Sequence, residues 1–150
     1  MLGKLATTTL ISAALCAAAL AQTTLGTAAE AKAMLEKAAA AVKADKAKAI
    51  ETFNKGEGGF KDRDLYPFCF NMSDGKFVAG QAAFLGKDAR ALKDSAGKAI
   101  GEEIYKSAQE GKITETSAYM FPRPGQTEPS SKVSFVTRIG DVACAVGYHK

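Results

Sequence analysis

The chain has 150 residues, a length that suits one domain, and its 47% hydrophobic and 24% charged residues are typical of a globular protein. This composition excludes a disordered chain as the default interpretation. The net charge of +4 comes from 20 basic and 16 acidic residues that interleave along the sequence. Because they form no basic block, we expect no nucleic-acid partner.

The first 21 residues have the pattern of a secretory signal peptide. Lys4 precedes an apolar run of small residues from Leu5 to Leu20, and Ala19-Leu20-Ala21 is a typical cleavage site. We therefore expect cleavage after Ala21 and a mature chain of residues 22–150, either periplasmic or secreted. A retained membrane anchor is the alternative, since the apolar run is barely long enough to span a bilayer.

The first element expected in the mature chain is one long helix over about residues 29–55. Ala and Lys dominate this segment, and it contains no Gly or Pro before Gly56. Such a helix is about 38 Å long, more than a small sheet can cover, so we expect part of it to project or to pair with a second copy. Residues at steps of three and four predict its apolar face: Ala31, Met34, Leu35, Ala38, Val42, Ala49, Ile50 and Phe53.

Residues from about 60 to 150 are predicted to form an antiparallel sheet with short helices between the strands. The turn at residues 73–76 predicts a hairpin of strands 65–72 and 77–80, and a second hairpin turns at Ile139-Gly140-Asp141. Because helical and extended segments are segregated, the fold class is α+β. The other expected elements are short helices at 89–92 and 98–110 and strands at 112–121, 132–138 and 142–148.

Cys69 and Cys144 are the cysteines that remain after the expected cleavage. In an oxidising compartment two such thiols can form a disulfide, and two separate buried thiols fit the sequence equally well. Two distant cysteines and one histidine do not make a tetrahedral metal site. The chain also lacks the C-x-x-C-H motif for haem, so we expect no metal and no cofactor.

No catalytic motif stands out. The chain lacks G-x-S-x-G, the P-loop and H-E-x-x-H. Its single histidine, His149, is the next-to-last residue, and we interpret it as part of a frayed terminus rather than as a catalytic base. We therefore expect a binding protein rather than an enzyme.

A series of short motifs runs through most of residues 30–150. After the long helix come Asp64-Leu65-Tyr66-x-Phe68-x-Phe70, Met72-Ser73-Asp74-Gly75, Leu85-Gly86-Lys87-Asp88 and Leu92-Lys93-Asp94 with Gly97. The series continues with Tyr119-x-Phe121-Pro122-x-Pro124, Pro129-x-x-Lys132-Val133-Ser134-Phe135-Val136 and Val146-Gly147-Tyr148. In order and spacing these motifs resemble a single Cache domain, the extracytoplasmic PAS-like sensor module of bacteria.

The resemblance implies a long N-terminal helix packed on a five-stranded antiparallel PAS-like sheet with short connecting helices. The first and last strands of such a sheet are neighbours, which would place Cys69 near Cys144 and so favours a disulfide between them. The resemblance also implies a pocket on one sheet face, covered by the connectors around residues 84–97. Ligands of such domains are typically small carboxylates or related metabolites.

A buried carboxylate needs a positive group or several hydrogen-bond donors around it. Lys132 is the first candidate, because it matches the family's lysine before the apolar strand, although an exposed lysine at a strand end is the alternative. Tyr119 offers a ring and a hydroxyl donor. The other candidates are Phe121 and Pro122 as a rigid wall, and Tyr66, Phe68 and Phe70 as an aromatic face, each of which could also belong to the core.

We therefore expect an exported sensor or binding domain for a small organic anion. Many members of the resembled family lie between two transmembrane helices, but here neither a second apolar segment nor an output module follows Tyr148. The domain would then pass its state to a partner such as a membrane-bound signalling protein. The alternative is an interaction module of the cell envelope that forms a homodimer through its long helix and has no functional pocket.

Overall fold

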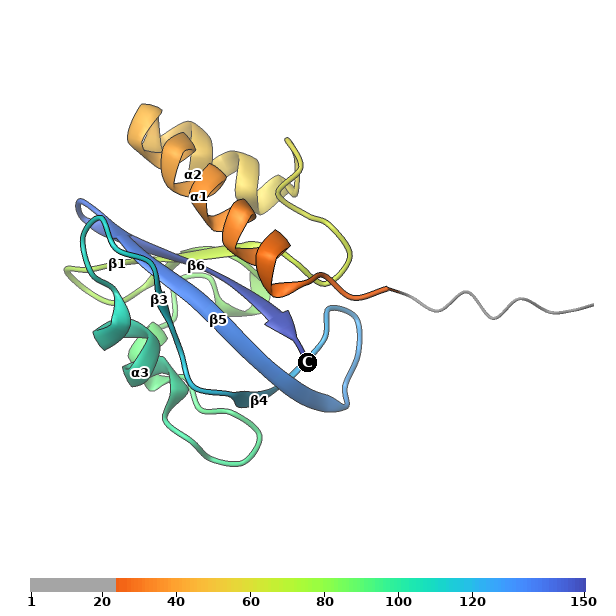
Figure 1. Cartoon of the computed structure of the whole chain (residues 1–150). Helices are drawn as coiled ribbons and strands as arrows, with labels where there is room; N and C mark the ends of the chain where they lie inside the picture. Colours follow the sequence, from red (N-terminus) through yellow and green to blue (C-terminus); the bar gives the residue numbers. More distant parts are fainter. Residues whose placement is uncertain (1–23) are drawn as a thin grey trace, which may run out of the picture.

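The computed structural model describes residues 24–150, so the expected signal peptide and its cleavage site lie outside the described residues. Two helices cover one face of a curved antiparallel sheet and a third helix lies on the other side (Figure 1). The expected α+β class is confirmed. In chain order the elements are α1 (Ala28–Ala44), α2 (Lys46–Lys55), β1 (Pro67–Asn71), β2 (Phe77–Ala79), the 3₁₀ turns η1 (Ala82–Phe84) and η2 (Ala89–Ala91), α3 (Ile100–Ser107), β3 (Thr114–Glu115), β4 (Tyr119–Pro122), β5 (Pro129–Ile139) and β6 (Val142–His149).

The N-terminal helical segment is two helices, so the prediction of one helix over 29–55 is wrong. Asp45 has an extended backbone (φ −158°, ψ 99°), and its carboxylate accepts a hydrogen bond from Lys48 N at 3.0 Å. It therefore ends α1 and caps α2, and α2 packs beside α1 (Figure 1). The length argument for a projecting dimerisation helix no longer holds.

The apolar face predicted for this segment is confirmed. Seven of its eight residues are buried, and Ile50 is partly buried against the same cluster. Phe53, for example, is 5% exposed and its ring lies 4.5 Å from that of Phe60. The chain's own sheet and loops therefore cover this apolar face.

The sheet has six strands in five positions. Its order is β2-β1-β6-β5-β3, and β4 pairs with β5 further along the same edge as β3. The single strand expected over 112–121 is thus two short pieces, because the backbone ladder to β5 is interrupted between them. Ser134 N on β5 donates to the side-chain Oγ1 of Thr116 at 3.1 Å, and Ser117 N turns away from β5 and donates to Glu103 Oε1 at 2.5 Å.

The first and last strands are neighbours, as the resemblance implied. Cys69 and Cys144 are register partners on β1 and β6, with their Cα atoms 4.1 Å apart, and they form a disulfide. The disulfide prediction is therefore confirmed, and the alternative of two separate thiols is wrong. The bond lies in the layer between the sheet and α1–α2.

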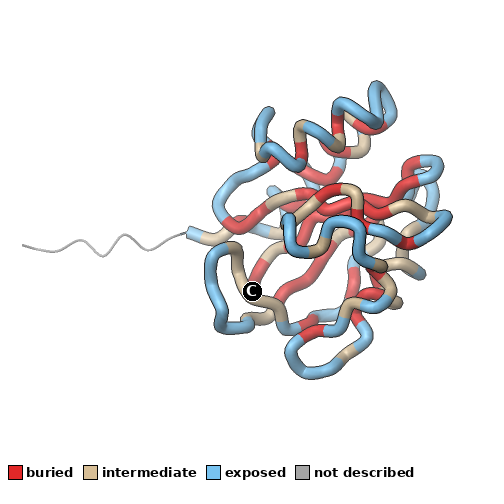
Figure 2. The backbone as a smooth tube through the Cα atoms, turned by 180° about the vertical axis from the view of Figure 1, so that it is seen from behind, coloured by how far each residue is buried: buried red, intermediate tan, exposed pale blue. Residues whose placement is uncertain are grey.

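Alternation along β6 separates the two sides of the sheet. Val142, Cys144 and Val146 pack with α1 and α2. Ala143 and Ala145 face the opposite cluster, which contains the aromatic residues of β1 and two isoleucines of α3. Buried residues follow the central strands, whereas exposed residues occupy the outer loops and the outer sides of the helices (Figure 2).

Candidate ligand-binding site

A row of three side chains crosses the sheet on the face away from α1 and α2. Tyr119 on β4 is the register partner of Lys132 on β5, and Lys132 is in turn the partner of His149 on β6. Register partners project from the same face. Gly147 leaves room for this row, because a Cβ built there would lie 2.3 Å from Lys132 Cε and 2.7 Å from Ser134 Oγ.

Lys132 is buried, with 1% of its surface exposed. Its Nζ lies 3.4 Å from Tyr66 Oη, 4.8 Å from the centre of the Tyr66 ring and 5.3 Å from that of Phe121. No carboxylate of residues 24–150 lies within ion-pair distance of Nζ. Burial lowers the pKa of Lys132 to about 8, although the charge of Asp64 partly opposes this shift.

Two tyrosines place hydroxyl groups beside this amine. Tyr66 Oη accepts hydrogen bonds from Gln81 Nε2 at 2.8 Å and from Lys132 Nζ, which leaves its own proton available to a further acceptor. Tyr119 Oη lies 2.7 Å from Ser134 Oγ. Burial raises the pKa of Tyr66 to about 12 and also raises the pKa of Tyr119, so both are neutral hydrogen-bond donors at neutral pH.

The amine and the aromatic rings line a cavity of about 30 Å³. This volume holds about two water-sized groups. Apart from Lys132, the lining contains no charged side chain. It is formed by Tyr66, Phe68, Phe77, Ala79, Gly80, Gln81, Phe84, Leu92, Ile104, Tyr119, Phe121 and Lys132.

Five of the seven predicted binding residues line this cavity: Lys132, Tyr119, Phe121, Tyr66 and Phe68. The other two lie elsewhere. Phe70 is fully buried, and its ring stacks 5.8 Å from that of Tyr105 on α3. Pro122 ends β4, where it pairs with Pro129. Gln81, Ser134 and residues of the covering turns also belong to this region, but the sequence motifs did not single them out for binding.

The prediction that His149 belongs to a frayed terminus is wrong. The residue is 3% exposed, its Nδ1 lies 2.9 Å from Asp64 Oδ2 and its Nε2 lies 3.3 Å from the carbonyl oxygen of Phe121. The alternation of β6 was the signal that could have found it, because Ala143, Ala145, Gly147 and His149 share a face.

Opposing effects act on the protonation of His149. Both ring nitrogens face acceptors, an arrangement that only the doubly protonated ring satisfies. Burial nevertheless lowers the pKa of His149, and the positive charge of Lys132 adds to that effect. Burial would raise the pKa of Asp64, but hydrogen bonds from Gly26 and His149 outweigh it and hold that pKa below its ordinary value.

Residues 24–150 contain neither a cluster of metal ligands nor a membrane-spanning helix. In this part of the chain, no three His, Cys, Asp or Glu side chains gather as metal ligands would. None of its helices is long and apolar enough to cross a membrane.

Three solved structures have a similar fold. A methyl-accepting chemotaxis protein from Vibrio parahaemolyticus RIMD 2210633 is 19% identical, with a TM-score of 0.63 over 81% of this chain and 86% of that one. The periplasmic sensor domain of a chemotaxis protein is 20% identical, with a TM-score of 0.60 over 79% and 87%. A Cache chemosensory domain, whose structure is described as the basis for carboxylic acid recognition, is 19% identical, with a TM-score of 0.57 over 79% and 85%.

At these identities the structural neighbours show a shared fold. No curated protein matches the chain. The sequence profile of the Cache domain, in contrast, matches residues 23–150. Because this match spans well over half of the sequence, the chain belongs to the Cache domain family.

Proposed function

We propose that this Cache domain is an exported sensor domain that binds a small monocarboxylate in the cavity beside Lys132. One observation carries the proposal: a buried amine faces an apolar cavity and has no carboxylate partner in residues 24–150. An unpaired charge in such surroundings is unfavourable, so an anion that enters the cavity would be strongly stabilised.

The lining favours one carboxylate and a short apolar tail. Lys132 and the hydroxyl of Tyr66 offer donors to an acid group, whereas Phe68, Phe77 and Ile104 offer only apolar surface. A second carboxylate, or the ammonium group of an amino acid, would have no partner of opposite charge there. The small volume favours acids of the size of acetate and propionate, with some widening of the cavity on binding.

Export and signalling complete the proposal. The N-terminal pattern of a signal peptide supports a location outside the cytoplasm. The resemblance to sensor domains of chemotaxis proteins supports a sensory role, in which a membrane-bound partner responds to the occupied domain. We infer no catalysis, because a buried lysine and neutral tyrosines, with no acid in the lining, are suited to binding an anion.

Thermal unfolding of the mature protein with acetate and propionate tests the proposal. A ligand that binds only the folded state at 100 times its Kd stabilises it by about 2.7 kcal/mol. Both acids should raise Tm, whereas propylamine, glycine and succinate at equal ionic strength should not.

Lys132→Met is the matched variant, because it keeps a long apolar side chain and removes the amine. It should remove the response to both acids. Equal shifts in the wild type and in this variant, or no shift with any monocarboxylate, would refute the assignment.

A further inference from the structure

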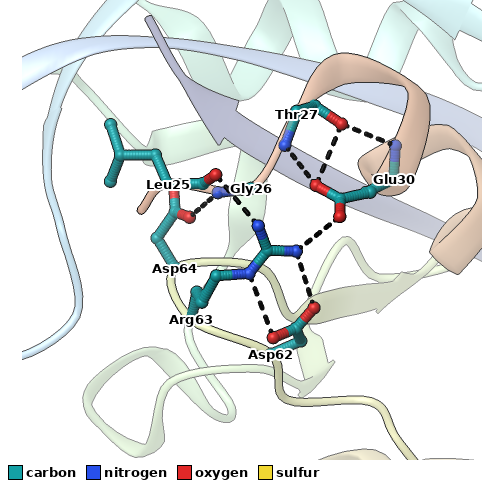
Figure 3. Close-up of polar contacts among 7 residues, drawn as sticks. All are labelled: Leu25, Gly26, Thr27, Glu30, Asp62, Arg63 and Asp64. Carbon is teal, nitrogen blue, oxygen red and sulfur yellow. Dashed lines mark hydrogen bonds and ion pairs between the residues drawn. The ribbon is translucent and has the colours of Figure 1, made fainter. Parts of the chain in front are cut away.

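The residues that enter the domain, Thr24–Thr27, are held against the loop that precedes β1; we refer to them as the N-terminal segment. Gly26 N donates to Asp64 Oδ1 at 2.6 Å, and Arg63 Nη1 donates to the Leu25 carbonyl oxygen at 3.1 Å (Figure 3). A Cβ at Gly26 would lie 2.3 Å from Leu65 Cγ. The segment is therefore in close contact with this loop.

The same loop anchors the start of α1. Thr27 and Glu30 form a capping box, and Arg63 contacts Glu30 at 2.7 Å and Asp62 at 2.8 Å (Figure 3). These contacts are exposed. The N-terminal segment is therefore fixed by these solvent-exposed contacts and by a buried one, to Asp64, which is 5% exposed.

Asp64 has a second oxygen, and that oxygen faces the sheet. It lies 2.9 Å from His149 Nδ1, and His149 Nε2 lies 3.3 Å from the carbonyl oxygen of Phe121. The ring of Phe121 lines the cavity and lies 5.3 Å from Lys132 Nζ. Asp64 and His149 do not line the cavity themselves, and the proposed binding of an acid does not use them.

We infer that Asp64 and His149 link the cavity wall to the N-terminal segment, so that filling the cavity and docking the segment stabilise each other. This inference rests on the proposed function for its ligand, but the link itself is a property of the unliganded protein. Asp64 and His149 are positioning residues in this scheme, because neither one touches the ligand.

Charge gives the link a physical basis. The charged groups that face His149 are Asp64 and Lys132, and Lys132 disfavours the doubly protonated ring. A carboxylate beside Lys132 would offset that repulsion and strengthen both hydrogen bonds of the ring. A firmer bond from His149 would fix Asp64, the acceptor of the Gly26 N–H. By thermodynamic reciprocity, a docked segment would raise affinity for the acid by the same factor.

The link can be tested without ligand through the exchange rate of the Gly26 amide, measured by NMR. His149→Phe keeps a ring of similar size and removes both hydrogen bonds, and it should speed exchange at Gly26 about fivefold or more. His149→Gln can restore one bond to Asp64 and should recover part of the protection. The Lys98 amide, which donates to Asp94 at 2.8 Å, reports general loosening and should not change.

His149→Leu is a second variant in case His149→Phe does not fold. It leaves Asp64, the direct acceptor of Gly26, in place and removes both hydrogen bonds of the ring, so exchange at Gly26 should again rise while Lys98 stays unchanged. An unchanged Gly26 rate in either folded variant overturns the inference, since a role confined to the end of β6 would not reach that amide.

Acetate provides the second arm of the test. It should slow Gly26 exchange in the wild type and leave the rate unchanged in His149→Phe. If acetate raises Tm without altering Gly26, the coupling is refuted while the proposed function stands. If acetate leaves Tm unchanged but His149→Phe still speeds Gly26 exchange, the link is supported and acetate binding is refuted.

Discussion

The two faces of the sheet use the same strands for opposite purposes. Toward α1 and α2 the strands present Val142, Cys144 and Val146, which form a continuous apolar layer around a disulfide. Toward α3 the same β6 presents Ala143, Ala145 and Gly147, above which lie aromatic rings, a buried amine and a cavity. The difference indicates that the first face stabilises the fold, whereas the second contains a buried amine with no carboxylate partner in residues 24–150, which lowers stability.

The largest expected effect concerns the helix-covered face. Cys69 and Cys144 are separated by 75 residues, and breaking a bridge over such a loop costs about 4 kcal/mol in the chain-entropy model. The double variant Cys69→Ala/Cys144→Ala should therefore unfold at a much lower denaturant concentration. Thiol titration of the unreduced, denatured mature protein should find no free thiol, and two free thiols would contradict the bridge.

On the other face, Lys132→Met should stabilise the domain. Burial lowers the pKa of Lys132 from 10.5 to about 8. Where the amine is protonated in both the folded and the unfolded state, this shift lowers the free energy of unfolding by about 3 kcal/mol. The folded state carries this cost in full below pH 8, and it disappears as pH rises from 8 to 10.5, because the folded state loses its proton first.

Chemical unfolding of both proteins from pH 7 to pH 10.5 measures this effect. The advantage of the variant should shrink steadily over that range. Tyr66 and Tyr119 are common to both chains, so their titration cancels in the difference. A variant that is less stable than the wild type at pH 7 would show that the amine is well paired.

Two adjacent residues of β6 give the sharpest comparison of the faces. Val146→Ala removes two methyl groups from the helix-covered layer and should cost about 2 kcal/mol, with acetate affinity unchanged. Gly147→Ala places a methyl group against Lys132 and Ser134. It should cost about 1–3 kcal/mol and weaken acetate binding, because the amine must move. Chemical unfolding measures the loss of stability in each variant, and calorimetry measures its affinity for acetate. An equal loss of acetate affinity in both variants would contradict the proposed difference between the two faces.

The smallest effect is expected at the surface, where Lys46 contacts Asp141 at 2.6 Å with both side chains largely exposed. Such pairs contribute little to stability. Lys46→Gln should therefore leave both Tm and the acetate response unchanged, and it serves as the neutral reference for the other variants. A clear loss of either property would mean that the turn between β5 and β6 matters more than its exposure indicates.

Local patterns predicted most of the fold. The period-two aromatics of β1, the turn at residues 139–141 and the spacing of small residues in β6 all depend on neighbours along the chain, and they lie as expected. The break at Asp45 was missed, because an Asp between two helical runs fits both a continuous polar face and a cap. The split of β3 from β4 was missed because it depends on side-chain hydrogen bonds between segments far apart in the sequence, from Ser134 N to Thr116 Oγ1 and from Ser117 N to Glu103 Oε1.

The site was partly predictable for the same reason. The family resemblance pointed to Lys132 and Tyr119, and alternation placed Tyr66 and Phe68 on the same face as Phe70. Which of these aromatic residues reach the cavity depends on cross-strand register and on α3, which covers Phe70. The alternation of β6 indicates the face on which His149 lies, but its burial also depends on its partners from distant parts of the chain, Lys132 and Asp64.

The strand order has a consequence for biogenesis. β6 lies in the middle of the sheet, between β1 and β5, yet it is synthesised after every other strand. Because synthesis starts at the N-terminus, α1, α2 and the hairpin of β1 and β2 can form early. They lack the central strand that joins them to β5 until β6 has been made. Cooperative folding must then wait until β6 is available, and only at that stage can the pairing of β1 with β6 align the two cysteines for their disulfide.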